Sequence, residues 1–86
     1  MPELSRFYGI VIKMYFDDHD PSHFHVEYAE DEAVISIETL AVIAGRLRPR
    51  ALGLVSEWAA QHQDDLRNAW TKAKNLDAPE KIAPLP

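Results

Sequence analysis

The sequence predicts an α+β fold in which an antiparallel four-stranded meander is packed by one long C-terminal helix. Short apolar segments alternate with polar ones between residues 7 and 44, and the connections between them are too short for parallel crossovers. After Pro49 the apolar period changes to about 3.6 residues. A chain of 86 residues supports only one small core, so we expect residues 1–86 to form a single domain. Residues 77–86 contain three prolines and are expected to form an extended tail.

The strands are predicted from period-two alternation and from the turns between them. Apolar residues recur at alternate positions over residues 8–16, which favours one strand with a single face in the core. Residues 17–22 are polar and indicate a loop, whereas 33–37 and 40–43 are apolar segments joined as in a hairpin. The second strand, residues 23–28, has an apolar side (Phe24, Val26, Tyr28) and a polar side (His23, His25, Glu27). We expect its apolar side to face the helix and its polar side to face away from it.

The helix is predicted over residues 49–75. Its apolar residues, including Trp58 and Trp70, occupy one arc of the helical wheel, so we expect both tryptophans to pack in the core. A break near Gln63 or Asp64, either of which could begin a second helix, is the alternative to one continuous helix.

The composition limits the chemistry available to this chain. It contains no cysteine, which excludes disulfides, thiolate ligands and cysteine nucleophiles and leaves histidines and carboxylates as the reactive groups. Residues 1–43 hold nine acidic and two basic residues, whereas residues 44–86 hold five acidic and seven basic ones. This distribution disfavours DNA binding and favours a metal ion or a basic partner at the acidic half. No apolar segment approaches the roughly 20 residues of a membrane helix, so we expect a cytoplasmic protein without a membrane partner.

Three of the four histidines lie close together in the acidic half. On a strand, His23 and His25 project to the same face about 6.5–7 Å apart, a separation that one metal ion can bridge. The preceding loop can bring a third histidine and a second carboxylate over the same spot. We therefore predict one divalent metal ion, zinc or manganese, with His23 and His25 also as the catalytic groups. The predicted ligands are His19, His23, His25, Glu27 and Asp17. A solvated polar strand face, with aspartates that only shape the turn, is the alternative.

Two further features are candidates for binding. Arg46, Arg48 and Arg50 alternate just before the helix and form a candidate phosphate-binding cluster, although they could instead pair with the acidic half of the chain. His62 lies within the apolar arc of the helix, where it either lies adjacent to the site or is a satisfied core group.

The segments FDDHDPSHFHVEY, EAVISIETL and RALGLVSEWAAQHQDDL, with the closing KIAPL, resemble the small bacterial family catalogued as domain of unknown function 4160. Members carry a core similar to D-H-x-P-P-H-F-H. This sequence departs from it at Ser22 and matches it at Asp18, His19, Pro21, His23, Phe24 and His25. The resemblance implies no particular reaction. It implies a stand-alone bacterial protein encoded beside another small protein, as one component of a toxin–antitoxin-like gene pair.

Two classes of function fit these observations. The first is hydrolysis of RNA at the histidine segment, with a metal ion because the seven carboxylates between residues 17 and 32 would repel a phosphodiester. The second is a non-catalytic acidic module that binds a small basic partner protein encoded nearby. Association with a second copy of the chain is compatible with either function.

Overall fold

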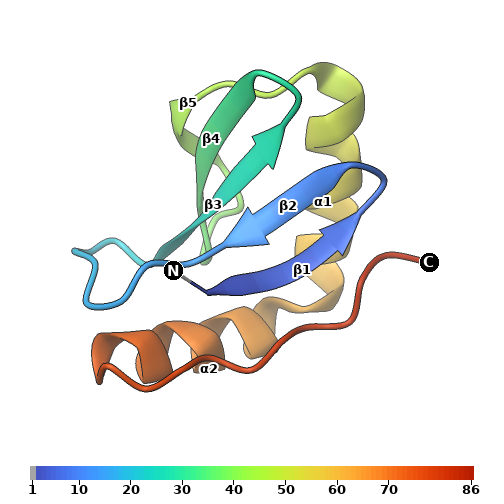
Figure 1. Cartoon of the computed structure of the whole chain (residues 1–86). Helices are drawn as coiled ribbons and strands as arrows, with labels where there is room; N and C mark the ends of the chain where they lie inside the picture. The colour runs from blue at the N-terminus through green and yellow to red at the C-terminus, as the bar shows by residue number, and fades with distance from the viewer. Residues whose placement is uncertain (1) are drawn as a thin grey trace.

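The computed structural model describes residues 2–86, which form an antiparallel five-stranded sheet and two helices (Figure 1). The strands are β1 (Glu3–Phe7), β2 (Ile10–Lys13), β3 (His23–Tyr28), β4 (Asp31–Ser36) and β5 (Val42–Gly45), and the helices are α1 (Pro49–Gln61) and α2 (Gln63–Lys74). The strands lie side by side in the order of the sequence, and each pairs with the next in antiparallel orientation. The α+β class and the antiparallel meander are confirmed, with five strands and two helices in place of four and one.

The extra strand is β1, which lies before the segment predicted as the first strand and forms a hairpin with β2. Phe7 pairs with Ile10, and the two residues between them, Tyr8 and Gly9, have φ values of 50° and 80°. Positive φ at both central residues is typical of the tight turn that matches the twist of two antiparallel strands. The strand predicted over residues 8–16 is shorter in the structure, Ile10–Lys13, and the strand before the turn was not predicted.

The connection between β2 and β3 is the longest in the first half of the chain, and it carries the loop predicted at residues 17–22. The backbone N–H of Met14 donates to the carbonyl of Pro2 at 3.1 Å, and that of Asp17 donates to the carbonyl of Ala73 at 3.0 Å. The loop is therefore tied to the start of the chain at one point and to the end of α2 at another.

Helix α1 covers one face of the sheet, as Figure 1 shows, and the core lies between the two layers. Phe24 and Val26 of β3 are buried on this face, as predicted, and the Phe24 ring lies 6.1 Å from that of Trp58. Trp58 is fully buried, and its indole N–H donates to the carbonyl of Ala83 at 2.8 Å. The core role predicted for Trp58 is confirmed, while Trp70 is partly buried and packs against the edge of the core.

The continuous helix predicted over residues 49–75 is broken at His62, and the second helix begins at Gln63, as the alternative stated. His62 has φ −124° and ψ 24°, which are not helical values, and it separates α1 from α2. The side-chain amide of Gln63 donates to the carbonyls of Ile37 and Glu38 at 2.7 and 3.1 Å, which fixes the junction to the chain after β4. Within residues 2–86, neither helix has the length and apolar character needed to cross a membrane.

One edge of the sheet is covered by the C-terminal segment, and the other is exposed. Residues 77–86 are extended, as predicted, and run along β1, where the N–H of Ile82 donates to the carbonyl of Leu4 at 2.8 Å. Ile82 and Leu85 are buried, so this segment is part of the fold and covers the β1 edge. Strand β5 forms the opposite edge, and all four of its residues are exposed.

Candidate metal centre

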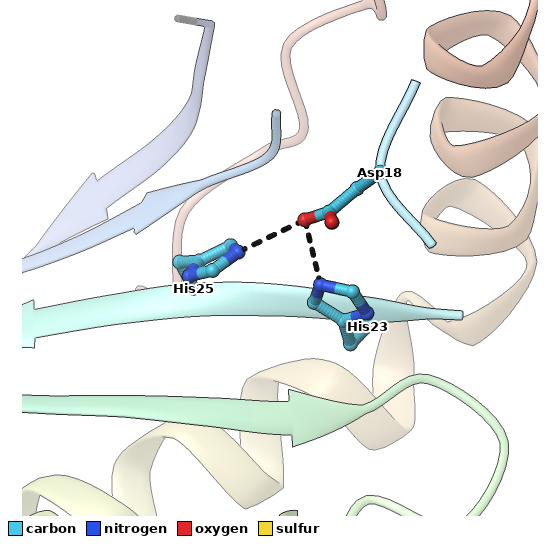
Figure 2. Close-up of side chains that lie close together, drawn as sticks. All are labelled: Asp18, His23 and His25. Carbon is cyan, nitrogen blue, oxygen red and sulfur yellow. Dashed lines mark hydrogen bonds and ion pairs between the residues drawn. The ribbon is translucent and has the colours of Figure 1, made fainter. Parts of the chain in front are cut away.

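Asp18, His23 and His25 come together where the loop after β2 meets the start of β3 (Figure 2). Oδ2 of Asp18 lies 2.8 Å from Nε2 of His23 and 3.4 Å from Nε2 of His25. One potential ligand atom from each residue lies within 4.8 Å of the other two. The cluster therefore presents two imidazole nitrogens and one carboxylate oxygen to a common point.

The two histidines project from the same side of β3 but differ in exposure. The His25 side chain is 25% exposed, whereas that of His23 is only 5% exposed. His23 packs against the ring of Trp70 on α2, with a centroid distance of 5.1 Å. The prediction that both histidines face away from the helical layer is therefore wrong for His23. The bend at His62 separates α2 from α1, and α2 places Trp70 against the start of β3.

The hydrogen bonds of His23 define which ring nitrogen carries a proton. Nδ1 lies 2.7 Å from the carbonyl oxygen of Pro21, which can only accept, so Nδ1–H is the donor. In a neutral ring, Nε2 then has a lone pair that faces a carboxylate oxygen of Asp18 at 2.8 Å. Two acceptors this close repel each other unless a proton or a metal ion lies between them. A histidine that donates Nδ1–H to a backbone carbonyl is also the usual arrangement for metal binding through Nε2.

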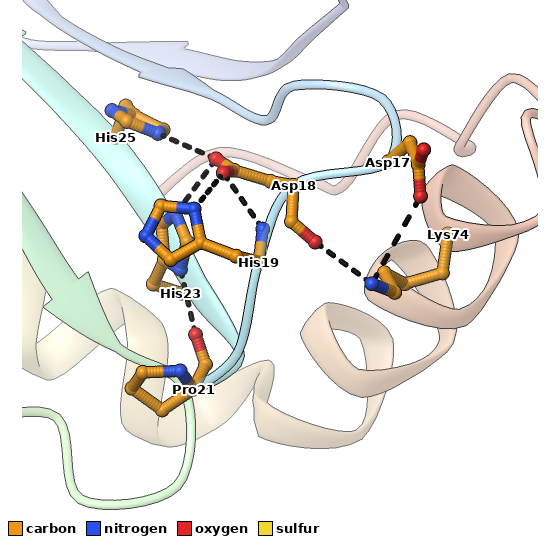
Figure 3. A network of polar contacts seen from close by, with 7 residues as sticks. All are labelled: Asp17, Asp18, His19, Pro21, His23, His25 and Lys74. Atoms are coloured by element: carbon orange, nitrogen blue, oxygen red, sulfur yellow. Dashed lines mark hydrogen bonds and ion pairs between the residues drawn. The ribbon is translucent and has the colours of Figure 1, made fainter.

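Asp18 is ionised at neutral pH. Burial alone would raise the pKa of its carboxyl, but hydrogen bonds outweigh burial and lower the pKa to about 2. Oδ1 accepts from the backbone N–H of His19 at 2.9 Å, and Oδ2 faces the rings of His23 and His25 (Figure 3). A carboxylate that keeps its charge in this setting can serve as a ligand for a cation.

His25 is held in the neutral form that metals require. Burial lowers its pKa, and the nearby His23 lowers it further, although the hydrogen bond to Asp18 acts in the opposite direction. The Tyr15 ring meets the His25 ring edge-on at a centroid distance of 4.3 Å. Neutral imidazole is the metal-binding form, so His25 is prepared for coordination near neutral pH.

The donor distances can be compared with those around a tetrahedral metal ion. Two ligand atoms bound at about 2.0–2.1 Å lie roughly 3.3 Å apart. The 3.4 Å between Asp18 Oδ2 and His25 Nε2 already fits this value. The distance of 2.8 Å between Asp18 Oδ2 and His23 Nε2 would have to lengthen by about 0.5 Å, which a small rotation of one side chain achieves. Three protein ligands leave a position for water, as in catalytic zinc sites.

The loop that carries Asp18 is held by the C-terminal end of α2. Lys74 Nζ donates to the backbone carbonyl of Asp18 at 2.9 Å and lies 4.0 Å from a carboxylate oxygen of Asp17 (Figure 3). Together with the bond from Asp17 N–H to Ala73, these contacts fix the Asp18 backbone relative to β3.

Comparison with known proteins adds a family assignment. The family model described as Domain of unknown function (DUF4160) matches residues 9–71, which is most of the chain. The chain belongs to the DUF4160 family. All three residues of the cluster lie within the matched region. No curated protein and no solved structure matches this chain.

Three of the ligands predicted for this DUF4160 protein lie outside the cluster. The ring of His19 is 87% exposed, and its Nδ1 contacts the other oxygen of Asp18 at 2.9 Å, so it lies at the rim. Glu27 is one strand period beyond His25, about 7 Å away, and pairs with Lys13 at 2.8 Å. Asp17 turns toward Lys74. The structure thus brings together His23 and His25 but not His19, Glu27 or Asp17.

The arginines before α1 pair with the β3–β4 hairpin of this DUF4160 protein. Arg48 Nε lies 3.2 Å from Asp31 and its terminal nitrogen 2.5 Å from Glu30, while Arg46 lies 3.9 Å from Asp31. Asp31 pairs with the last residue of β3, roughly 16 Å along the strand from His23. Arg46 and Arg48 therefore pair with the acidic half of the chain, which was the alternative to a phosphate-binding cluster. The exposed Arg50 lies on the first turn of α1, and none of the three belongs to the metal cluster.

His62 is not adjacent to the cluster either. Its Nδ1 lies 3.2 Å from Asp65, and its ring packs 5.5 Å from Trp58. It lines a cavity of about 380 Å³ between α2 and residues 80–83, and no member of the metal cluster lines that cavity. The interpretation as a satisfied group near the core fits this placement better than a role at the site.

Asp18 is the member of the cluster that was not predicted from the spacing of the residues. It is one of the matched positions of the D-H-x-P-x-H-F-H pattern, so the signal was present in the resemblance. Spacing alone could not distinguish it from Asp17, because the loop conformation decides which carboxylate turns inward. Asp17 has φ 48°, and its side chain points to Lys74, while that of the next residue reaches the histidines.

Proposed function

We propose that this protein holds one divalent transition-metal ion, zinc or manganese, between Asp18, His23 and His25 and uses it to hydrolyse RNA. The main supporting observation is the 2.8 Å approach of His23 Nε2 to the ionised carboxylate of Asp18 in a nearly closed position, where a proton or a cation has to lie between the two atoms. A cation bound to both atoms would take the place of that proton and would take His25 as its third ligand.

The charge around the cluster explains why a metal ion is needed for a phosphodiester substrate. Asp17, Asp20 and Glu32 add negative charge on the same half of the molecule. A divalent ion reverses the local field, and it supplies a hydroxide near neutral pH by lowering the pKa of a bound water. A hollow of about 230 Å³ on the open face of the sheet, lined in part by His25 and Glu32, gives a substrate access to this side.

His19 is the residue available to protonate the leaving oxygen. Its ring is exposed at the rim and is oriented by Asp18 Oδ1, while His23 and His25 are occupied as ligands. The choice of RNA as substrate follows from the expected toxin–antitoxin-like gene pair, in which one component commonly acts on RNA.

Calorimetric titration of chelator-treated protein with zinc and manganese chlorides tests the metal site. We expect one ion per chain at pH 7.5 and markedly weaker binding at pH 5.5, because the imidazole ligands must be neutral. His25→Ala, and separately His23→Ala/His25→Ala, should abolish this binding, whereas His62→Ala removes a histidine outside the cluster and should preserve it. Binding no tighter than millimolar at pH 7.5, or equal affinity in the double variant, would contradict the metal site.

Cleavage of labelled RNA by the metal-loaded protein tests the reaction. Cleavage should require the ion, stop with excess chelator and fall strongly in Asp18→Asn, while Asp20→Asn serves as the matched control. Metal binding without any cleavage would leave a metal site but refute the hydrolysis.

A second candidate is an acidic module that binds a small basic partner protein. The observation in its favour is that the exposed Asp20 and Glu32 have no ion-pair partner among residues 2–86. The test is co-purification of a basic protein encoded by a neighbouring gene. Co-purification that does not depend on metal and is lost in Asp20→Asn/Glu32→Gln would favour this function over hydrolysis.

A further inference from the structure

Strand β5 is the exposed edge of the sheet (Figure 1). Val42 and Ile43 are 37% and 47% exposed, and residues 40–45 contain no charged side chain and no proline. Charges, prolines, bulges and covering segments are the usual devices that keep an edge strand from pairing with another chain. The β1 edge has such a cover, the segment 77–86, whereas no segment of residues 2–86 other than β4 bonds to the backbone of β5.

Two backbone groups of β5 point away from β4. The carbonyl of Ala41 and the N–H of Arg46, which flank the strand, each bond to the backbone of β4 at 2.9 Å. The C=O and N–H of one trans peptide point in opposite directions, so the N–H of Val42 and the carbonyl of Gly45 face outward. The free edge therefore presents a donor near one end and an acceptor at the other.

A bulge sets the spacing between these two groups. The register of β5 on β4 skips Ile43, so β5 has one residue more than the segment it pairs with. The outward groups of Val42 and Gly45 therefore lie three residues apart, whereas a regular edge strand presents such groups at every second residue. A regular strand from another protein can match one of these positions but not both. A second β5 has the same spacing, with donor and acceptor in reverse order when the two strands run antiparallel.

We propose that β5 pairs with the β5 of a second copy of this chain, in antiparallel orientation about a two-fold axis. In this register, Val42 N–H donates to the Gly45 carbonyl of the second copy, and the axis repeats the bond at the other end. Ile43 of each copy lies beside the axis, where the pairing covers its exposed side chain. The pairing needs neither the metal ion nor the hydrolysis, because each Asp18–His23–His25 centre lies at the start of β3, two strands from the junction.

The charges next to β5 favour this orientation. Arg46 is the only charged residue between positions 40 and 46, and its side chain is 83% exposed. In the antiparallel register it lies opposite Ala41 of the second copy, so the two Arg46 side chains start about 16 Å apart, beyond the screening length of roughly 8–10 Å in physiological salt. A parallel pairing would place the two arginines next to each other.

Sedimentation of the full chain over a micromolar concentration range tests the pairing. One strand from each copy makes a small interface, so we expect the mass to rise toward twice that of the chain within this range, equally with and without chelator. Val42→Pro removes the outward N–H but no bond to β4, so it should keep the fold and weaken dimerisation by at least about tenfold, because two bonds are lost per dimer. Val42→Thr keeps both the N–H and the β-branched shape, and it serves as the matched control.

A charge pair at position 43 tests the register. Ile43→Lys and Ile43→Glu each place two like charges beside the axis, so each variant alone should be monomeric. An equimolar mixture of the two should dimerise again, and more strongly at low salt, because unlike charges then meet across the axis. Thermal melts of each variant establish that the fold is kept.

The contrary outcomes are distinct from those of the proposed function, because none of them involves RNA or a metal ion. A wild-type chain that stays monomeric over this range would overturn the pairing. A dimer that persists in both Val42→Pro and Ile43→Lys would overturn it as well, since another surface would then hold the copies together. Failure of the lysine and glutamate variants to dimerise when mixed would refute the register, and species that grow beyond the dimer would refute the closed two-fold arrangement.

Discussion

Asp18→Asn should destabilise the metal-free protein by an amount that depends on pH. The pKa of the carboxyl is about 2 in the folded protein, against 3.8 for the free group. A difference of this size corresponds to roughly 2.4 kcal/mol at neutral pH, at 1.36 kcal/mol per unit. The side chain is 17% exposed, and solvent screening reduces the value, so we expect a loss of about 1–2 kcal/mol in the free energy of unfolding.

The sign follows from the lowered pKa. A carboxyl whose pKa falls on folding stabilises the protein above its unfolded pKa, and this stability is lost as the pH falls from about 4 toward 2. Urea unfolding of the wild type and Asp18→Asn with chelator, at pH 7 and again at pH 3, should therefore give a difference that shrinks by about half. Asp20→Asn, an exposed change in the same loop, should have little effect at either pH. A wild-type advantage that is absent at pH 7, or that is the same at both pH values, would refute the assignment of Asp18 as an ionised, hydrogen-bonded group.

Four other substitutions test the fold and its relation to the site. Trp58→Ala removes the largest fully buried side chain and should cost about 3–5 kcal/mol in urea unfolding, whereas a loss below about 1 kcal/mol would contradict its core role. His25→Ala should cost only about 0.5–1 kcal/mol in metal-free protein because the side chain is partly exposed, and thermal melts would contradict this if it proved more damaging than the tryptophan change. Gly45→Ala would place a Cβ 2.2 Å from the carbonyl oxygen of Glu32 at φ +72° and should cost more than about 2 kcal/mol. Gly53→Ala lies in a helix with nothing within 4 Å of the added Cβ and should instead raise the free energy of unfolding by about 0.5–1 kcal/mol. If both glycine substitutions changed stability in the same direction, this interpretation of their surroundings would be refuted.

The period of the apolar residues was sufficient to predict which face of β3 is covered and the extent of the helical segment. Phe24 and Val26 face Trp58 because alternation along a strand leaves no other choice once one face is covered. The turn at Tyr8 and Gly9 was not predicted because alternation carries no information about where a strand folds back on itself. The break at His62 was left open for a related reason. The apolar arc passes through it, and the junction is fixed by the bonds of Gln63 to a distant part of the chain.

The position of the site in the chain could be predicted from the sequence, but its full set of residues could not. Two histidines at spacing two on a strand must share a side, so His23 and His25 were correct as neighbours. Their third partner depends on the path of the loop, which is set by contacts of Asp17 and Asp18 with Lys74 and Ala73, more than 50 residues later in the chain. The burial of His23 under Trp70 has the same origin. Local patterns cannot report contacts of this range, whereas the resemblance already contained Asp18.

The bond between Leu4 and Ile82 joins the first strand to a segment that the ribosome makes almost 80 residues later. Every strand pairing in the sheet links neighbours in sequence and can form while the nascent chain emerges. The edge of β1 cannot be closed at that stage, and the indole of Trp58 still lacks its acceptor at Ala83. During synthesis the protein is therefore a sheet with two open edges, which is the state most exposed to pairing with other nascent chains. The final contacts that protect it form only when residues 77–86 have left the exit tunnel.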